Sequence, residues 1–380
     1  MSDIAKYQEL LVGPIERFDQ INTIFKRAVF DPVWVERSKV LNEPASTQQA
    51  GYTQEDYALR IAAGYIKKVF SMGKEISSMA MMNAQESVVA EKTGASTSQI
   101  DTSDSAEISR KIKIAARFFG ASLVGICKLD RRWIYSRVIN EITQEHVSLE
   151  IPEGFQYAIA IAIEMSHSYI QTSPTYGASA ATHLGYSQMA FVAASLAEFI
   201  QGLGYKAIPA ANDSALSIPI AIEAGLGELG RNGLLITQEF GPRVRLCKVF
   251  TDLPLVPDEP RFFGVDDFCR KCMKCAKDCP SQAISFEERT TEALNISNNP
   301  GVLKWPVHAE QCFKYWIANR TGCANCIRVC PFNKEVGRVH DLIRAMIKTT
   351  PWLNPLFIWL DDILGYGRQH DPGRIWLLDG

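Results

Sequence analysis

The chain has 380 residues and a formal net charge of −2, and 47% of its residues are hydrophobic and 22% charged. This is an ordinary composition for a globular protein of about two or three domains, or of one large core with an appended module. The balanced charge argues against a nucleic-acid partner, because such proteins present a clustered basic face. No apolar run reaches the roughly 18 residues that a membrane-spanning helix needs, so the chain is not expected to span a membrane.

The first 105 residues form the least regular part of the sequence. A helix is expected over Asp56–Met72, and the polar, Ser- and Thr-rich stretch Asn83–Ser105 is typical of a loop or linker. Residues Met1–Glu9 contain neither a basic segment followed by an apolar run nor a twin-arginine pair. We therefore expect a cytoplasmic protein, or one associated with the periplasmic face of a membrane if a twin-arginine leader has been removed.

From residue 106 helices and strands alternate, which predicts an α/β or α+β sheet domain over residues 106–260. The expected helices are Ile108–Phe119, ending at Gly120, and Met189–Leu203, ending at Gly204; the expected strands are Ser122–Leu129, Tyr157–Met165, Tyr205–Pro209 and Leu234–Thr237. Three prolines between residues 254 and 260 mark the end of this domain. Residues 261–335 form a cysteine-rich module, and residues 336–380 a tail that we expect to pack on the core.

The module holds eight of the ten cysteines, and their short spacing indicates metal ligation rather than a disulfide scaffold. The first motif, Cys269 to Pro280, reads C-x2-C-x2-C-x3-C-P, the bacterial ferredoxin pattern for 4Fe–4S clusters. The second motif, Cys323 to Pro331, has one cysteine fewer, and Cys312, eleven residues upstream, can supply the missing thiolate.

In the ferredoxin pattern the fourth cysteine of a motif binds the other cluster. We therefore predict a first cysteine set of Cys269, Cys272, Cys275 and Cys330, and a second cysteine set of Cys279, Cys312, Cys323 and Cys326. The alternative is a pair of zinc ribbons, which would need separated cysteine pairs in tetrahedral closure. The remaining two cysteines, Cys127 and Cys247, are interpreted as small buried core residues.

Several further motifs resemble the corrinoid-dependent reductive dehalogenases. They are Ala224–Leu246, Lys248–Leu255, Phe263–Val265, Gly185–Met189, Gly204–Pro209, the variant second cysteine motif and the tail motif Asp361–Gly367. The resemblance runs from about Ile108 to about Gly367, whereas the first hundred residues match poorly and look shortened. It implies an α+β fold in which a nitroreductase-like core binds base-off cobalamin beside a C-terminal ferredoxin-like module with two 4Fe–4S clusters.

The resemblance also implies roles for individual residues in the reductive removal of halide from an organohalide. Tyr186, which we expect at the opening of a helix, falls on the proposed proton donor, and Arg245 on the arginine beside it. A guanidinium stabilises a phenolate and so makes proton donation by a tyrosine easier. Asn212 and Thr182 match the same pocket, and Trp316 matches an aromatic wall against an apolar substrate.

Other expectations concern the cofactor, the pocket and the partners. Candidate corrinoid contacts are Ser217, Gly225, Gly227 and Thr237, and none of the six histidines sits in the D-x-H-x-x-G motif that offers a cobalt ligand. The divergent N-terminal region, residues 1–105, is expected to be helical and to close the pocket, with Phe30, Trp34, Phe70 and Met79–Met82 as possible lining residues. The expected electron donor is a ferredoxin, a flavodoxin or a quinol-linked membrane partner, and a homodimer is a further expectation.

Two other functions fit the same motifs. An epoxyqueuosine reductase, which modifies tRNA, resembles this family in its cofactors, but it would need a more basic surface and different proton-donor chemistry. An electron carrier or corrinoid carrier without enzymatic activity would not need about 260 residues ahead of its clusters.

Overall fold

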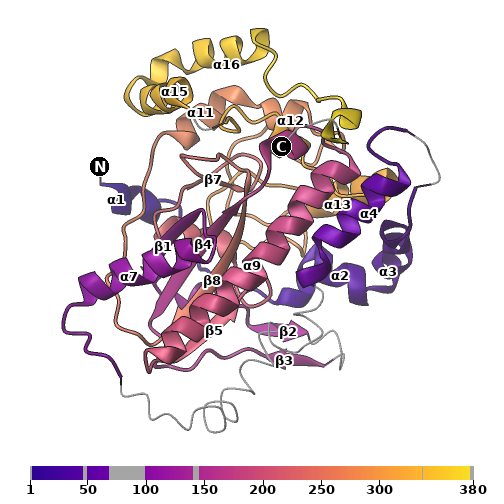
Figure 1. Cartoon of the computed structure of the whole chain (residues 1–380). Coiled ribbons are helices and arrows are strands. Elements are labelled where there is room, and N and C mark those ends of the chain that lie inside the picture. The colour runs from indigo at the N-terminus through magenta and orange to yellow at the C-terminus, as the bar shows by residue number, and fades with distance from the viewer. Residues whose placement is uncertain (1, 46–48, 68–98, 140–144, 336, 377–380) are drawn as a thin grey trace.

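A four-stranded antiparallel sheet forms the centre of the protein in a computed structural model that describes residues 2–45, 49–67, 99–139, 145–335 and 337–376 (Figure 1). The strands lie in the order β1 (Leu123–Lys128), β4 (Tyr157–Glu164), β8 (Val244–Thr251) and β5 (Ala207–Ala210). Helices α7 (Ser105–Phe118) and α9 (Tyr176–Gly202) pack on one face, and α10 (Ser217–Glu223) packs on the other.

The sequence of β4 explains how the sheet separates two cores. It alternates Ala and Ile, and the residues of a strand point alternately to its two faces. Ile159, Ile161 and Ile163 enter the core under α7 and α9, whereas the alanines between them face the core that contains α10. The small alanines leave room for this short helix to lie close to the sheet.

Most of the elements expected for the sheet domain are present, but the second helix was placed too short. The prediction Met189–Leu203 covers only the C-terminal half of α9, which begins at Tyr176. Its first half is rich in Gly, Ala and Ser and is buried on most sides, so it lacks the amphipathic pattern that identifies a surface helix. Tyr186 consequently lies in the middle of a helix and not at its opening.

Short elements complete the sheet domain. The hairpin of β2 (Arg137–Ile139) and β3 (His146–Ser148) and the pair of β6 (Glu228–Leu229) and β7 (Leu235–Ile236) are separate two-stranded sheets. The remaining elements are η3 (Arg131–Trp133) and α8 (His167–Ile170). Of these, the sequence predicted only the strand around β7.

The described part of the N-terminal region is helical. It comprises α1 (Asp3–Gln8), η1 (Gln20–Asn22), α2 (Ile24–Phe30), α3 (Pro32–Ser38), η2 (Lys39–Asn42) and α4 (Gln54–Ala63). Helix α4 packs on α9, and Trp34 is buried against Phe313 of the cysteine module, so its position is explained by core packing. Phe70, Met79–Met82 and the end of the predicted helix Asp56–Met72 lie outside the described residues.

The first cysteine motif and helices of the tail lie at one end of the molecule, whereas the helix that carries Cys312 lies beside α2 (Figure 1). Four helices carry the cysteine motifs or flank them: α11 (Val265–Cys272), α12 (Lys274–Lys277), α13 (Ala309–Asn319) and α14 (Asn325–Arg328). The tail forms α15 (Arg338–Thr349), η4 (Pro351–Leu353), α16 (Asn354–Ile363) and η5 (Pro372–Trp376). Helices α15 and α16 form an outer layer over α11 and α12, and α16 contacts α11 (Figure 1). None of the described helices is both long and apolar enough to cross a bilayer.

A buried carboxyl group connects the N-terminal segment to the sheet domain. The Tyr7 hydroxyl and the Trp133 indole both donate to Glu223 Oε1, over 2.6 and 2.8 Å. Burial raises the pKa of Glu223 to about 7, so the carboxyl group is largely protonated in the folded protein below neutral pH.

The Glu223→Gln variant should therefore lose a pH dependence of stability that the parent has. Between the ordinary pKa of 4.5 and the folded value of about 7, the folded state binds a proton that the unfolded state has released. The parent should lose up to about 3 kcal/mol of stability as the pH rises through this window. Urea unfolding at about pH 5 and about pH 8 measures this loss, and equal losses in parent and variant would contradict the prediction.

Candidate functional site

The first cysteine set surrounds a cavity. Its four members, Cys269, Cys272, Cys275 and Cys330, all line this cavity together with residues of β7 and of the loop before it. The chain reverses at Met273, which has a left-handed backbone (φ 52°) between α11 and α12. This turn lets cysteines from both sides of Met273 face one space.

The second cysteine set is also gathered in one place. Burial raises the pKa of Cys312 to about 12, and the neighbouring thiols of Cys323 and Cys279 add to the increase. Cys326 is surrounded in the same way, since its pKa is raised first by burial and then by Cys323, Cys312 and Cys279. Cys312, which lies outside the short motif, thus joins the other three cysteines as the sequence analysis expected.

The grouping fits two iron–sulfur clusters better than it fits zinc. Within the described residues no three His, Cys, Asp or Glu side chains converge on a single-ion site. A cubane spaces its thiolates widely because each one binds a different iron, whereas zinc draws its ligands around one atom. All ten cysteines are free thiols. The donors present therefore suit one cluster in each set, with the exchange of Cys279 and Cys330 between the motifs.

The two sets adjoin each other, and the second lies against Met165 and α9. Cys275 of the first set is in electrostatic contact with Cys326 of the second. Cys326 packs in an apolar group with Met165 and Ala181, and the Met165 sulfur lies 3.3 Å from Arg245 Nε. The second cysteine set is consequently on the side of Arg245 and α9.

Two cations lie against the ring of Tyr186. The Arg245 guanidinium carbon is 5.2 Å from the centroid of the Tyr186 ring, and Lys67 Nζ is 4.7 Å from it. Both distances are within the range of a cation–π contact. Gly185 makes room for this arrangement, because a Cβ at that position would lie 2.9 Å from Arg245 Cγ.

A polar chain reaches the same tyrosine from the other side. Asn212 Nδ2 donates to the Tyr186 hydroxyl over 3.4 Å, and the Ser217 hydroxyl donates to Asn212 Oδ1 over 3.2 Å. Ser217 in turn accepts from Lys248 Nζ over 3.0 Å. Lys248 is fully buried in β8, and burial lowers its pKa to about 8. The chain of contacts fixes the orientation of the Asn212 amide.

Thr182 joins this group and Trp316 lies further away. Arg245 Nη2 donates to Thr182 Oγ1 over 3.4 Å, one helical turn from Tyr186. Trp316 packs with Phe25 and Phe313, and no contact between it and Tyr186 is present among the described residues. The structure thus brings together four of the five residues expected at the catalytic pocket.

Three of the four expected corrinoid contacts have roles in packing. Gly225 follows α10 with φ 73°, and a Cβ on Gly227 would lie 2.2 Å from the carbonyl oxygen of Ile236. The Thr237 hydroxyl donates to the Gly241 carbonyl and accepts from the Phe240 amide within one turn. Of the four residues, Ser217 lies in the polar group beside Tyr186. Contact with a corrinoid stays a prediction for all four.

Sequence reasoning missed the two lysines of this site. Lys67 lies in a part of the chain with no recognisable motif, and its contact with Tyr186 spans more than a hundred residues of sequence. Lys248 occurs inside an apolar strand, where a lone lysine is a signal for a buried polar role. That signal was available in the sequence.

The Cys312→Ala variant should lose about four irons per chain, because it removes one thiolate from the second cysteine set. The Cys247→Ala variant is the matched control, since Cys247 is a buried thiol that lies in the sheet and outside both cysteine sets. Iron analysis after anaerobic reconstitution measures both. Full iron content in Cys312→Ala would remove Cys312 from the ligand set.

Comparisons with known proteins give the context for this geometry. A family model described as a 4Fe-4S dicluster domain matches residues 268–334. A tetrachloroethene reductive dehalogenase of Sulfurospirillum multivorans is 39% identical over 301 residues, which is 73% of this chain and 60% of the relative. A tetrachloroethene reductive dehalogenase of Desulfitobacterium hafniense is 40% identical over 305 residues, which is 70% of this chain and 55% of the relative.

The comparison of folds agrees with the comparison of sequences. A solved reductive dehalogenase, described in terms of B12-dependent dehalogenation, superposes with a TM-score of 0.69 and 25% identity, over 96% of this chain and 49% of that one. The chain therefore spans roughly half to 60% of the length of the relatives that it matches. By sequence over about 70% of its length, and by fold over nearly all of it, the chain is similar to reductive dehalogenases.

Proposed function

We propose that this protein is an oxidoreductase that removes halide reductively from an organohalide. The observation that carries the proposal is the position of Tyr186, in contact with the cations Arg245 and Lys67 and on the side of the second cysteine set. A phenol in this position can deliver a proton where electrons arrive. Reductive dehalogenation needs both at one carbon atom.

The proposed cofactors are two 4Fe–4S clusters and base-off cobalamin, with the sheet domain as a nitroreductase-like corrinoid-binding core. When bound, the clusters would pass single electrons and the cobalt would supply the strong reductant for the carbon–halogen bond. The loop before α10 offers polar groups for such a ligand: Asn212 is exposed, and the buried Ser214 hydroxyl has no hydrogen-bond partner among the described residues. An unsatisfied buried hydroxyl supports a bound polar ligand at this loop.

Tyr186 has the role of proton donor to the carbon that loses its halide. Proton loss leaves a phenolate, which the guanidinium of Arg245 and the ammonium of Lys67 stabilise electrostatically. Asn212 holds the hydroxyl oxygen in place, and Thr182 holds the Arg245 guanidinium. A tyrosine gives up its proton only when negative charge develops beside it. Protonation of the substrate before its reduction is thereby avoided.

The proposed substrate class, an apolar halogenated compound, rests on the similarity to reductive dehalogenases. Trp316, expected as an aromatic wall of the pocket, lies instead in an aromatic group with Phe25 and Phe313 and does not contact Tyr186 among the described residues. The proposed electron donor is a ferredoxin, a flavodoxin or a quinol-linked membrane partner, and the proposed assembly is a homodimer.

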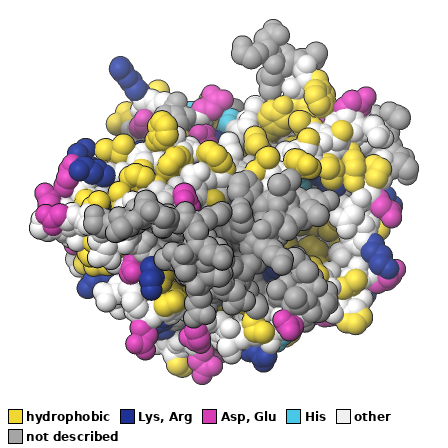
Figure 2. Space-filling model, turned by 60° about the horizontal axis from the view of Figure 1, so that its bottom comes forward, with side chains coloured by type: hydrophobic (Ala, Val, Ile, Leu, Met, Phe, Trp, Pro, Cys, Tyr) yellow, Lys and Arg dark blue, Asp and Glu magenta, His cyan; other side chains and the backbone are white. Residues whose placement is uncertain are grey.

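The alternative activity, epoxyqueuosine reduction on tRNA, is less well supported. A protein that binds an anticodon stem gathers basic side chains along the phosphate backbone. On the face shown in Figure 2, the visible Lys and Arg side chains are scattered and interspersed with Asp and Glu. The formal net charge of −2 points in the same direction.

Halide release tests the activity directly. The reconstituted holoprotein, supplied with a reduced viologen and a panel of chlorinated and brominated compounds, should release chloride or bromide in proportion to the viologen oxidised. The same preparation should leave an epoxyqueuosine-containing tRNA stem-loop unchanged. Reduction of that RNA without release of halide from any member of the panel would replace the proposal by the alternative.

Tyr186→Phe should keep both kinds of cofactor and lose at least about a hundredfold in turnover, the usual contribution of a general acid. The matched control is Tyr205→Phe, because the Tyr205 hydroxyl lies beyond the end of α9, where it donates to the Ile100 carbonyl and shares a hydrogen bond with the Thr102 hydroxyl. Steady-state halide release measures both variants. Turnover at the parent rate in Tyr186→Phe would exclude this residue as the proton donor.

A further inference from the structure

The tail motif Asp361–Gly367 has no part in the proposed chemistry, yet it contains a nearly buried carboxylate. Asp361 is only 6% exposed and contacts two lysines at once. Its oxygens lie 2.5 Å from Lys274 Nζ and 2.5 Å from Lys334 Nζ, and Lys274 is also 2.7 Å from the more exposed Asp362. Two buried cations thus converge on a single buried anion.

Both lysines belong to the surroundings of the first cysteine set. Lys274 lies between Cys272 and Cys275 in sequence, and Lys334 follows Cys330 by four residues. The charges of Lys274 and Asp361 act on Cys272, and those of Lys334 and Asp361 act on Cys330. The negative charge of Asp361, a residue of the tail, therefore opposes the positive charges of both lysines at the first cysteine set.

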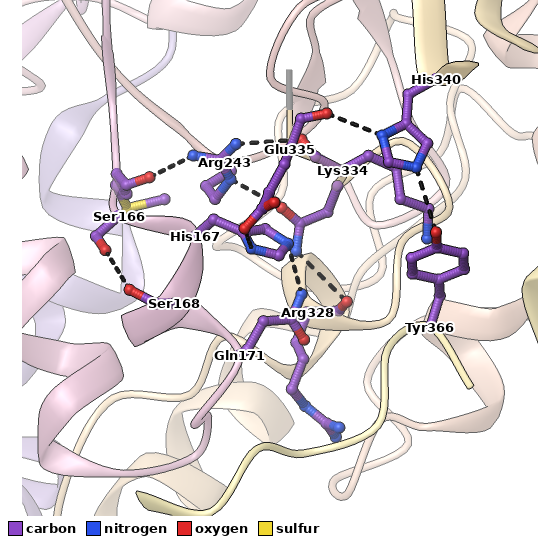
Figure 3. Close-up of polar contacts among 12 residues, drawn as sticks. Ser166, His167, Ser168, Gln171, Arg243, Arg328, Lys334, Glu335, His340 and Tyr366 are labelled. Carbon is purple, nitrogen blue, oxygen red and sulfur yellow. Dashed lines mark hydrogen bonds and ion pairs between the residues drawn. The ribbon is translucent and has the colours of Figure 1, made fainter. Parts of the chain in front are cut away.

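The rest of the motif fixes the carboxylate in place. Gly367 has φ 80°, and a Cβ there would lie 2.8 Å from Val329 Cα, so the tail passes directly against the second cysteine motif. Arg328 donates to the Gly367 carbonyl. The side chains of Lys334 and His340 are both directed at Tyr366, with Lys334 Nζ 3.7 Å from the centre of its ring (Figure 3). These contacts hold the tail over the module and shield Asp361 from water.

We propose that Asp361 sets the reduction potential of the cluster bound by the first cysteine set. The inference rests on the two-cluster assignment made above. Reduction brings one electron from an external donor into the ring of four thiolates and so adds one negative charge there. A nearby cation favours that charge and a nearby anion opposes it, and both effects are strong where water is excluded. Asp361 cancels the charge of a lysine and keeps the potential low.

A low potential at this position has a consequence for electron flow. The second cysteine set, not the first, lies on the side of Tyr186. An electron that arrives at the first set must move on to the second. A carboxylate beside the first set makes that onward step more favourable.

Three variants test the proposal by redox titration of the iron-loaded protein, followed by electron paramagnetic resonance. Asp361→Asn should favour reduction at the first set by about tenfold, which for a one-electron couple is about +59 mV. Lys334→Gln should shift the potential in the opposite direction, and the double variant should return close to the parent. Asp361→Asn keeps the shape of the side chain, and Lys334→Gln keeps an uncharged polar group that can donate hydrogen bonds, which limits the disturbance of the fold.

Asp371→Asn is the matched control, since it removes the charge of an exposed carboxylate of the same tail, which accepts a hydrogen bond from the Gly373 amide, and it should leave the potential unchanged. A shift in neither single variant, or shifts of the same sign in both, would overturn the proposal. The iron content separates this failure from a failure of the proposed function: about eight irons per chain with unchanged potentials contradicts only the role of Asp361, whereas absence of iron contradicts the cluster assignment itself.

Discussion

The gathering of eight partly or fully buried thiols in two adjoining sets is the constraint on which the rest of the structure depends. A buried thiolate is unfavourable unless a metal neutralises it, and burial accordingly raises the pKa of Cys269 in the first set and of Cys312 in the second. The sheet domain contributes to this burial through the loop between β6 and β7. Arg231 Nε donates to the Cys269 carbonyl, and Asn232 Nδ2 donates to the Cys326 carbonyl. The cysteine module is therefore built into the sheet domain rather than attached to it by a linker.

The same constraint positions the proposed proton donor. Arg243, just before β8, donates to the Met165 carbonyl over 2.6 Å and to Asn333 Oδ1 over 2.9 Å, and so joins the end of β4 to the segment after Cys330. Two residues further on, Arg245 pairs with Ile163 across the sheet and extends toward α9. Folding around the clusters thus fixes the register at which the guanidinium meets Tyr186. Electron delivery and proton delivery depend on one set of contacts.

The sequence was sufficient for some of these features and not for others. Three of the four central strands, β1, β4 and β5, follow from apolar runs, whereas β8 was not predicted because Arg245 and Lys248 interrupt its apolar pattern. The two cysteine sets follow from a spacing rule with a chemical cause. The pocket residues Tyr186, Arg245, Asn212 and Thr182 came only from the resemblance to a family, because nothing local distinguishes a catalytic tyrosine from a packed one. The first half of α9 was missed because its buried Ala and Gly residues carry no amphipathic pattern. Contacts of Lys67 with Tyr186 and of Asp361 with Lys274 join distant segments, so no local pattern predicts them.

The most direct test of the account is the metal content of the anaerobically reconstituted protein, offered iron, sulfide, zinc and cobalamin together. If the two cysteine sets hold clusters that pass electrons to a corrinoid beside Tyr186, the protein should contain about eight irons and about one cobalt per chain, with little zinc. Zinc in place of iron would contradict the interpretation of the cysteine sets. Iron without cobalt would leave an electron carrier and contradict the proposed enzyme.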